Sequence, residues 1–144
     1  MNNTVGRTVK REKIYFTDTG LACYLAGYVD YITLEKSVYS GAIFETYIVS
    51  ELIKSFVNQG KDARKHLYYY RDNYQKEIDL LINYDNIIYP IEIKKSANPG
   101  KDAIKNFDVV KFFETKAENG IVLCMIKVIV ALDENNYLVP IEYI

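Results

Sequence analysis

The stretch "EIDLLINYDNIIYPIEIKKS", from Glu77 to Ser96, decides the fold of this chain. Apolar residues alternate with polar ones on either side of the letters "NYDN", which is typical of two β-strands joined by a tight turn. The sequence therefore predicts a β-hairpin, and we place its two-residue turn at Tyr84 and Asp85.

On this register, Asp79 lies across from Pro90 and diagonal to Glu92, and the alternation of strand side chains puts Lys94 on the same face. Two neighbouring carboxylates repel each other when both are ionised, and a bound divalent cation removes that repulsion. Mg²⁺ prefers carboxylate oxygens, and a lysine beside it can stabilise charge on a phosphate. This set of residues is what metal-assisted phosphodiester hydrolysis requires. Taken alone, the residues favour a solvated face with ordinary cross-strand charge pairs.

The segments around this hairpin alternate between helical and strand-like patterns. The period of 3.6 residues, together with Gly60 as a helix end, predicts a long helix over residues 39–56. The remaining predictions are a short helix within 15–27, a strand at 66–71, a second long helix over 102–119 closed by Gly120, and strands within 121–132 and 136–144. This order predicts an α/β domain with a mixed β-sheet flanked by helices.

One acidic residue of the long helix falls on its apolar stripe. Glu45 lines up with Ile48, Val49, Leu52 and Phe56 on a helical wheel. A carboxylate on a core-facing stripe is costly unless something compensates it. One interpretation is a carboxylate that binds a metal or orients its water, and the others are an exposed position or a salt bridge to Arg71 or Lys94.

Composition limits the classes of protein that fit. The chain has 144 residues, of which 49% are hydrophobic and 26% charged, so we expect one folded domain over residues 13–144 after a flexible, polar segment 1–12. The net charge of -1 argues against a generally basic nucleic-acid coat. Two cysteines and one histidine form no disulfide framework or zinc pattern, which favours a cytoplasmic protein. Neither a signal peptide nor a membrane span is predicted, and no pattern indicates an oligomeric state.

Four blocks of the sequence carry a family resemblance. The spacing of Asp79 and the "IEIK" that holds Glu92 and Lys94 resembles the core of the PD-(D/E)XK nuclease superfamily, although Ile78 replaces the proline. The blocks "KIYFTDTGLACYLAG", "GAIFETYIVSELIK", "YYYRDNYQKEIDLLI" and "YPIEIKKS" together resemble the domain of unknown function that follows the AAA+ ATPase core in many prokaryotic proteins. The resemblance runs from about residue 13 to the end of the chain.

This resemblance implies a restriction-endonuclease-like fold and a candidate Mg²⁺- or Mn²⁺-dependent deoxyribonuclease. It implies Asp79, Glu92 and Glu45 as metal ligands and Lys94 as the catalytic cation, with DNA and an AAA+ ATPase core, in cis or in trans, as partners. The ATPase core itself is absent, and "GKDA" at residues 60–63 and 100–103 is no P-loop, so no ATPase activity is expected from this chain. The alternative is a catalytically inactive nuclease fold used as an interaction or nucleic-acid-binding module of such an ATPase.

Two further residues are candidates for contacts with phosphate. Arg71 ends the strand "YYYR", and its planar guanidinium could bind a phosphate with two hydrogen bonds. Ser96 follows the hairpin and could donate its hydroxyl. For both, a purely structural role at a strand end is the alternative.

Overall fold

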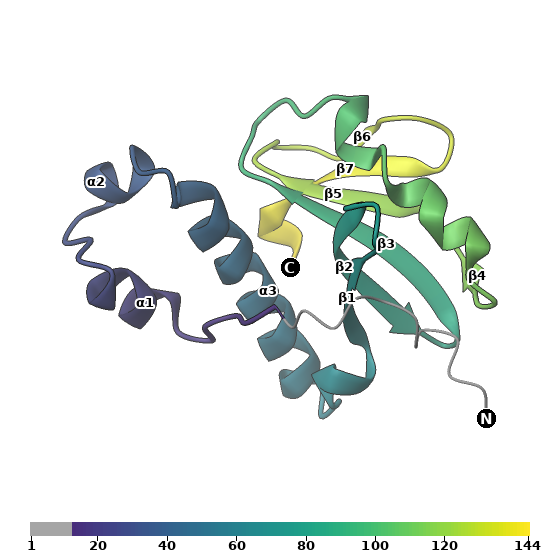
Figure 1. The fold of residues 1–144 in the computed structure, drawn as a ribbon, viewed down its shortest axis with the longest axis horizontal. Coiled ribbons are helices and arrows are strands. Elements are labelled where there is room, and N and C mark those ends of the chain that lie inside the picture. The colour runs from purple at the N-terminus through teal and green to yellow at the C-terminus, as the bar shows by residue number, and fades with distance from the viewer. Residues whose placement is uncertain (1–12) are drawn as a thin grey trace. The chain divides into compact units, whose positions relative to one another are not determined.

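A computed structural model describes residues 13–144, and the predicted flexible segment 1–12 lies outside these residues. The chain is an α/β protein (Figure 1). It divides into two compact units: a helical unit of residues 14–61 with Ile144, and a sheet unit of Lys13 with residues 62–143. A single domain over 13–144 stays a prediction.

Short helices with acidic caps begin the helical unit. Helix α1 (Thr19–Leu25) starts at Asp18, whose side chain accepts a hydrogen bond from the Leu21 backbone N–H at 2.8 Å. The predicted short helix is therefore confirmed. A second short helix, α2 (Tyr31–Glu35), was not predicted, although Asp30 caps it in the same way.

Helix α3 (Ser40–Asn58) confirms the predicted long helix. The predicted apolar stripe of Ile48, Val49, Leu52 and Phe56 is buried. The helix ends in a Schellman motif, because Lys61 N–H donates to the Phe56 carbonyl and Gly60 N–H to the Val57 carbonyl. Gly60 has a φ of 71°, a left-handed conformation that glycine adopts without steric cost.

The strands of the sheet unit form one mixed sheet within the described residues. The first three, β1 (Leu67–Arg71), β2 (Glu77–Tyr84) and β3 (Ile87–Lys94), pair antiparallel, and then β5 (Gly120–Cys124) and β7 (Asn136–Pro140) add in parallel. The order is β1-β2-β3-β5-β7-β6, with the short β6 (Val130–Ala131) at one edge and β4 (Lys116–Ala117) beside β3. Short 3₁₀ helices complete the unit: η1 (Ala63–Lys65), η2 (Lys101–Ile104), η3 (Phe107–Phe112) and η4 (Ile141–Tyr143). The predicted mixed α/β architecture is confirmed.

The hairpin turn lies one residue later than predicted. Asp85 and Asn86 have φ values of 51° and 61°, which belong to a type I′ turn, and Tyr84 pairs with Ile87. Moving a two-residue turn by one position shifts the strand pairing by two residues, so each side chain keeps its face. Pro90 therefore pairs with Leu81 instead of Asp79.

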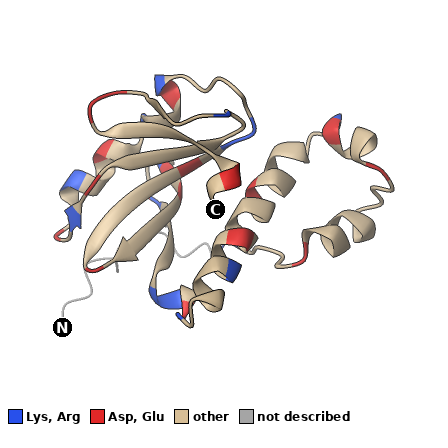
Figure 2. Cartoon of the chain, turned by 180° about the vertical axis from the view of Figure 1, so that it is seen from behind, with Lys and Arg blue, Asp and Glu red and all other residues tan. Residues whose placement is uncertain are grey.

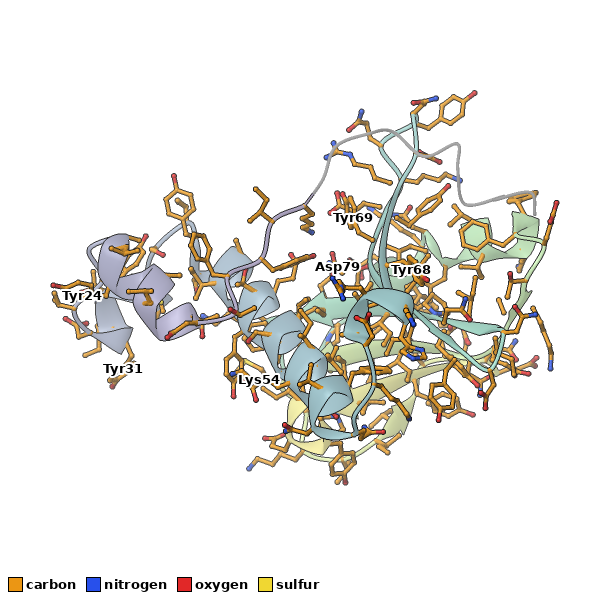
Figure 3. The ribbon with its side chains drawn as sticks, turned by 90° about the horizontal axis from the view of Figure 1, so that it is seen from below. Tyr24, Tyr31, Lys54, Tyr68, Tyr69 and Asp79 are labelled. Atoms are coloured by element: carbon orange, nitrogen blue, oxygen red, sulfur yellow. The ribbon has the colours of Figure 1, made fainter. Side chains whose placement is uncertain are left out.

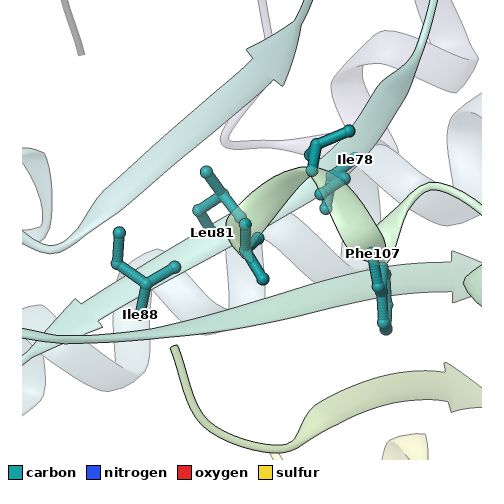
Figure 4. Packing of buried hydrophobic residues seen from close by; sticks show 6 residues of the cluster. Ile78, Leu81, Ile88 and Phe107 are labelled. Atoms are coloured by element: carbon teal, nitrogen blue, oxygen red, sulfur yellow. The ribbon is translucent and has the colours of Figure 1, made fainter. Parts of the chain in front are cut away.

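A β-bulge interrupts β2 beside the candidate site. Tyr68 pairs with Leu81 and Tyr70 with Ile78, so Asp79 and Leu80 together face the single residue between these tyrosines. The extra residue resets the alternation of side chains. As a result, Ile78 and Leu81 lie in the same buried cluster with Ile88 and Phe107 of η3 (Figure 4).

The second predicted long helix is wrong. Residues 101–104 and 107–112 form the separate 3₁₀ helices η2 and η3, and Gly120 begins β5 instead of closing a helix. The apolar residues Ile104, Phe107, Val110 and Phe113 recur at every third position, which matches the three residues per turn of a 3₁₀ helix. Their side chains pack in or against the buried cluster on the sheet.

Candidate functional site

The side chain of Asp79 accepts a hydrogen bond from a backbone N–H of β3 at the point where the pairing of β2 with β3 ends. Hydrogen-bonded and non-hydrogen-bonded pairs alternate in an antiparallel ladder, and Pro90, which has no N–H, fits the non-hydrogen-bonded type. Ile93 then directs its N–H toward β2, beyond Leu80 and Ile91, which form the last pair of the two strands. It donates to Oδ2 of Asp79 at 2.8 Å. The Asp79 carboxylate therefore holds the two strands together at the bulge.

The carboxylate of Asp79 is buried, with 9% of the residue exposed. A buried carboxylate is tolerated when hydrogen bonds and nearby cations compensate its lost hydration. The Ile93 N–H supplies one hydrogen bond, and Lys94 lies close enough for its charge to interact with that of Asp79. Leu80 and Ile91 form the last pair of β2 with β3, so Asp79 and Glu92 are the next residues on the two strands.

Glu92 and Lys94 form a direct ion pair. Nζ of Lys94 donates to Oε1 of Glu92 at 2.6 Å, and their side chains are 41% and 13% exposed, respectively. Burial disfavours the charged ammonium, but the hydrogen bond to Glu92 and the negative charges of Glu92, Asp79 and Asp102 outweigh it. Together they raise the pKa of Lys94 above its usual value. Lys94 is therefore protonated at neutral pH.

Asp102 is a neighbour of the site that the sequence did not indicate. It is the second residue of η2, two positions after Gly100, and its negative charge acts on Lys94. The sequence predicted Asp102 at the start of a long helix, and no sequence pattern indicated that it would lie near the hairpin. The loop after β3 brings it back toward the end of that strand.

Arg71 belongs to a second charged cluster, at the start of β2. Its guanidinium donates to the side chain of Gln75 and lies 3.9 Å from Oε2 of Glu77. Nζ of Lys13 lies 3.0 Å from Oε1 of Glu77 and 4.9 Å from the ring centroid of Tyr69.

Glu77 is therefore the shared anion of this second cluster. Burial favours its neutral form, but the hydrogen bond from Lys13 and the charges of Lys13 and Arg71 outweigh burial and lower the pKa of Glu77. Tyr69 sits on β1 opposite the bulge, and Figure 3 labels it together with Asp79. Contact between phosphate and Arg71 stays a prediction.

Ser96 closes the turn that follows β3. Its hydroxyl accepts a hydrogen bond from Asn98 N–H at 3.1 Å, and its carbonyl accepts one from Met125 N–H at 2.9 Å. These bonds give Ser96 a structural role at the end of the strand, and its contact with phosphate stays a prediction.

Glu45 has a partner inside the helical unit. The hydroxyl of Tyr15 donates to Oε1 of Glu45 at 2.9 Å, and both residues are half-buried. This bond compensates part of the cost of placing a carboxylate beside the buried stripe of α3. Participation of Glu45 in a site with Asp79 stays a prediction.

Comparison with known proteins identifies the family. A family model described as a domain of unknown function (DUF4143) matches residues 40–144, a range that contains Glu45, Asp79, Glu92 and Lys94. The chain belongs to this family.

Similar proteins occur in mycobacteria. The chain is 32% identical over 96 residues to two uncharacterized proteins, Rv2008c of Mycobacterium tuberculosis and Mb2031c of Mycobacterium bovis. These residues make up 66% of the chain and 20% of each relative, so the chain matches a fifth of the length of these relatives. No solved structure matches the chain.

The donor set of this DUF4143 domain limits the kind of metal site that fits. Among residues 13–144 there is no group of three or more His, Cys, Asp or Glu side chains placed to hold a metal ion. Asp79 and Glu92 nevertheless supply carboxylates from adjacent strands. Mg²⁺ is commonly held by one or two carboxylates while it keeps several waters, so this pair fits a partly hydrated Mg²⁺ or Mn²⁺.

The described helices place one further limit on the protein. No helix within residues 13–144 combines the length and the apolar character that a membrane crossing requires.

Proposed function

We propose that this chain carries a PD-(D/E)XK nuclease-like site, on a restriction-endonuclease-like fold, for metal-dependent hydrolysis of DNA phosphodiester bonds. One observation carries the proposal. Asp79 binds the amide of Ile93, the residue between Glu92 and Lys94, while Lys94 forms an ion pair with Glu92. Two carboxylates and a lysine from adjoining strands thus meet around one residue.

Each side chain has a distinct role in the proposed reaction. Asp79 and Glu92 would hold Mg²⁺ or Mn²⁺, with Glu45 as a third contributor. The metal, when bound, lowers the pKa of a coordinated water and neutralises charge on the phosphate. The raised pKa of Lys94 keeps this residue cationic, so it acts as a stabiliser of phosphate charge and not as a general base.

The wider context is also a proposal. We place this domain beside an AAA+ ATPase core, in cis or in trans, because of the sequence blocks that it shares with domains that follow such cores. The short match to the mycobacterial relatives agrees with a module inside longer proteins, since it covers 20% of their length.

A second candidate function is an inactive module for interaction or nucleic-acid binding. Its support is that the charged groups already have partners without a metal: Asp79 accepts from Ile93 N–H, and Glu92 pairs with Lys94. Because these contacts need no metal, the three residues could be kept only for the stability that the contacts give the sheet.

The experiment that tests the nuclease proposal uses the purified chain with plasmid and linear DNA. We expect cleavage in Mg²⁺ or Mn²⁺ that a chelator stops. Replacing Lys94 by alanine should slow cleavage about 100-fold or more, the typical cost of losing a charge-stabilising donor. Lys111→Ala is the matched control, because Lys111 forms an equally short ion pair with Asp108 outside the site, at 2.6 Å.

Calorimetry with Mn²⁺ separates the two candidate functions. If the site holds a metal, the chain binds Mn²⁺, and this binding is lost in Asp79→Asn but kept in Asp108→Asn. The nuclease proposal is contradicted if Lys94→Ala cleaves DNA as fast as the unchanged chain does, or if neither cleavage nor Mn²⁺ binding is seen. The absence of Mn²⁺ binding together with DNA binding supports the inactive module.

A further inference from the structure

The two short helices of the helical unit expose most of their apolar side chains. We call six exposed residues the apolar surface, five in the two helices and Val29 in the connection between them: Leu21, Tyr24, Leu25, Val29, Tyr31 and Ile32. Tyr24 is 75% exposed, Val29 88% and Tyr31 78%. In Figure 3, the labelled side chains of Tyr24 and Tyr31 project outward from α1 and α2.

These helices are defined by their caps more than by burial. Helix α1 has seven residues and buries Ala22, and none of the five described residues of α2 is buried. Helices this short are marginal in water unless an apolar face packs against something. Asp18 and Asp30 each bind a backbone N–H and fix where a helix begins, but they provide no packing.

The spacing of the exposed residues suits a helical partner. Leu21, Tyr24 and Leu25 stand three and four positions apart, so they line one face of α1. Such a row packs against the apolar face of another amphipathic helix. Tyrosine is also enriched at the centres of protein interfaces, because it combines a large apolar ring with a polar tip.

Charge decides which kind of helix fits. Residues 14–39 carry the carboxylates of Asp18, Asp30 and Glu35 and a single cation, Lys36. All four residues are exposed, and Figure 2 shows more red than blue along this segment. The hydrogen bonds that Thr33 donates lower the pKa of Asp30, which therefore stays ionised. This excess of exposed carboxylates disfavours a second copy of the same surface, as it does an anionic membrane, and favours a partner with lysine or arginine.

We infer that the apolar surface is the docking site for a basic amphipathic helix of a partner protein. The leucine and tyrosine side chains of α1 contact the apolar face of that helix, and the carboxylates at the helix caps pair with its flanking lysines or arginines. This inference is independent of the proposed nuclease site, because it uses no residue of that site.

The test uses the full chain and two synthetic helical peptides as probes. One peptide has a leucine face flanked by lysines, and the other has the same leucine face flanked by glutamates. We expect the lysine peptide to bind in calorimetry and the glutamate peptide to bind at least about tenfold more weakly. Tyr24→Ser should weaken the binding of the lysine peptide about tenfold or more. Tyr74→Ser is the matched control, because Tyr74 is 87% exposed in the turn between β1 and β2.

A second pair of variants tests the charges without disturbing the fold. Asparagine caps a helix about as well as aspartate. Asp30→Asn should therefore keep α2 folded and still weaken the binding of the lysine peptide severalfold. The control Asp62→Asn, at the cap of η1, should leave this binding unchanged. Equal binding of both peptides, equal effects of the variants and their controls, or no binding would overturn the inference. A dimer of the chain that Tyr24→Ser disperses would overturn it as well.

Discussion

Replacing Asp79 by alanine should destabilise the sheet unit far more than the loss of a surface charge does. The carboxylate is buried and accepts the Ile93 N–H at 2.8 Å. A hydrogen bond to a charged group contributes about 1.5–3 kcal/mol, and a buried donor left without a partner costs a similar amount. We therefore expect a loss of about 3 kcal/mol in the free energy of unfolding for Asp79→Ala.

Asparagine separates the hydrogen bond from the charge. Asp79→Asn keeps an acceptor oxygen near Ile93 N–H, so we expect it to cost about 1 kcal/mol. The control is Asp108→Ala, which removes an exposed partner of Lys111 and should change stability by less than about 0.5 kcal/mol.

Urea denaturation measures the three free energies, and amide hydrogen exchange of Ile93 reports the bond itself. Exchange at Ile93 should accelerate strongly in Asp79→Ala and much less in Asp79→Asn. If Asp79→Ala costs no more than Asp108→Ala, or if exchange at Ile93 is unchanged, the carboxylate does not hold the two strands and our description of the bulge is wrong.

Two further changes test the core and the second charged cluster. Gly120→Ala places a methyl group against the ring of Phe107, so we expect a loss of about 1–3 kcal/mol in urea denaturation, whereas Gly41→Ala in α3 meets nothing within 4 Å and should be neutral or stabilising. Glu77 has a lowered pKa in the folded protein, so its contribution is present above its ordinary value of 4.5 and is lost as the pH falls through the folded value. Glu77→Gln should therefore flatten the fall of the urea midpoint below about pH 5, and a Glu142→Gln control should not.

The hairpin was predictable because its signals agree with one another. The alternation around "NYDN" predicted both strands, and a one-residue error in the turn left every face unchanged because it moves the pairing by two. The bulge at Asp79 and Leu80 was not predictable in this way. The bulge depends on the register between β1 and β2, and the sequence of β2 alone does not determine that register.

Three other differences have physical causes. The spacing of three between Ile104, Phe107, Val110 and Phe113 was interpreted as helical in the ordinary sense, but a strict period of three belongs to a 3₁₀ helix. Helix α2 was missed because it is short and buries none of its described residues, which leaves no periodic stripe for the sequence to show. Tyr15 as the partner of Glu45 could not be predicted, since the two residues are 30 positions apart.

The bond between Asp79 and the Ile93 amide affects how activity should be judged in relatives of this domain. A relative that had lost any chemistry would still gain stability from an aspartate at this position, because the side chain stands in for a missing ladder bond. Retention of that aspartate is therefore a poor marker of activity. Lys94 donates to the side chain of Glu92 and not to a strand carbonyl in the contacts described above, so its replacement would leave the sheet in place while removing the cation. Under the proposed function, the lysine is therefore the residue whose loss should mark inactive members of the family.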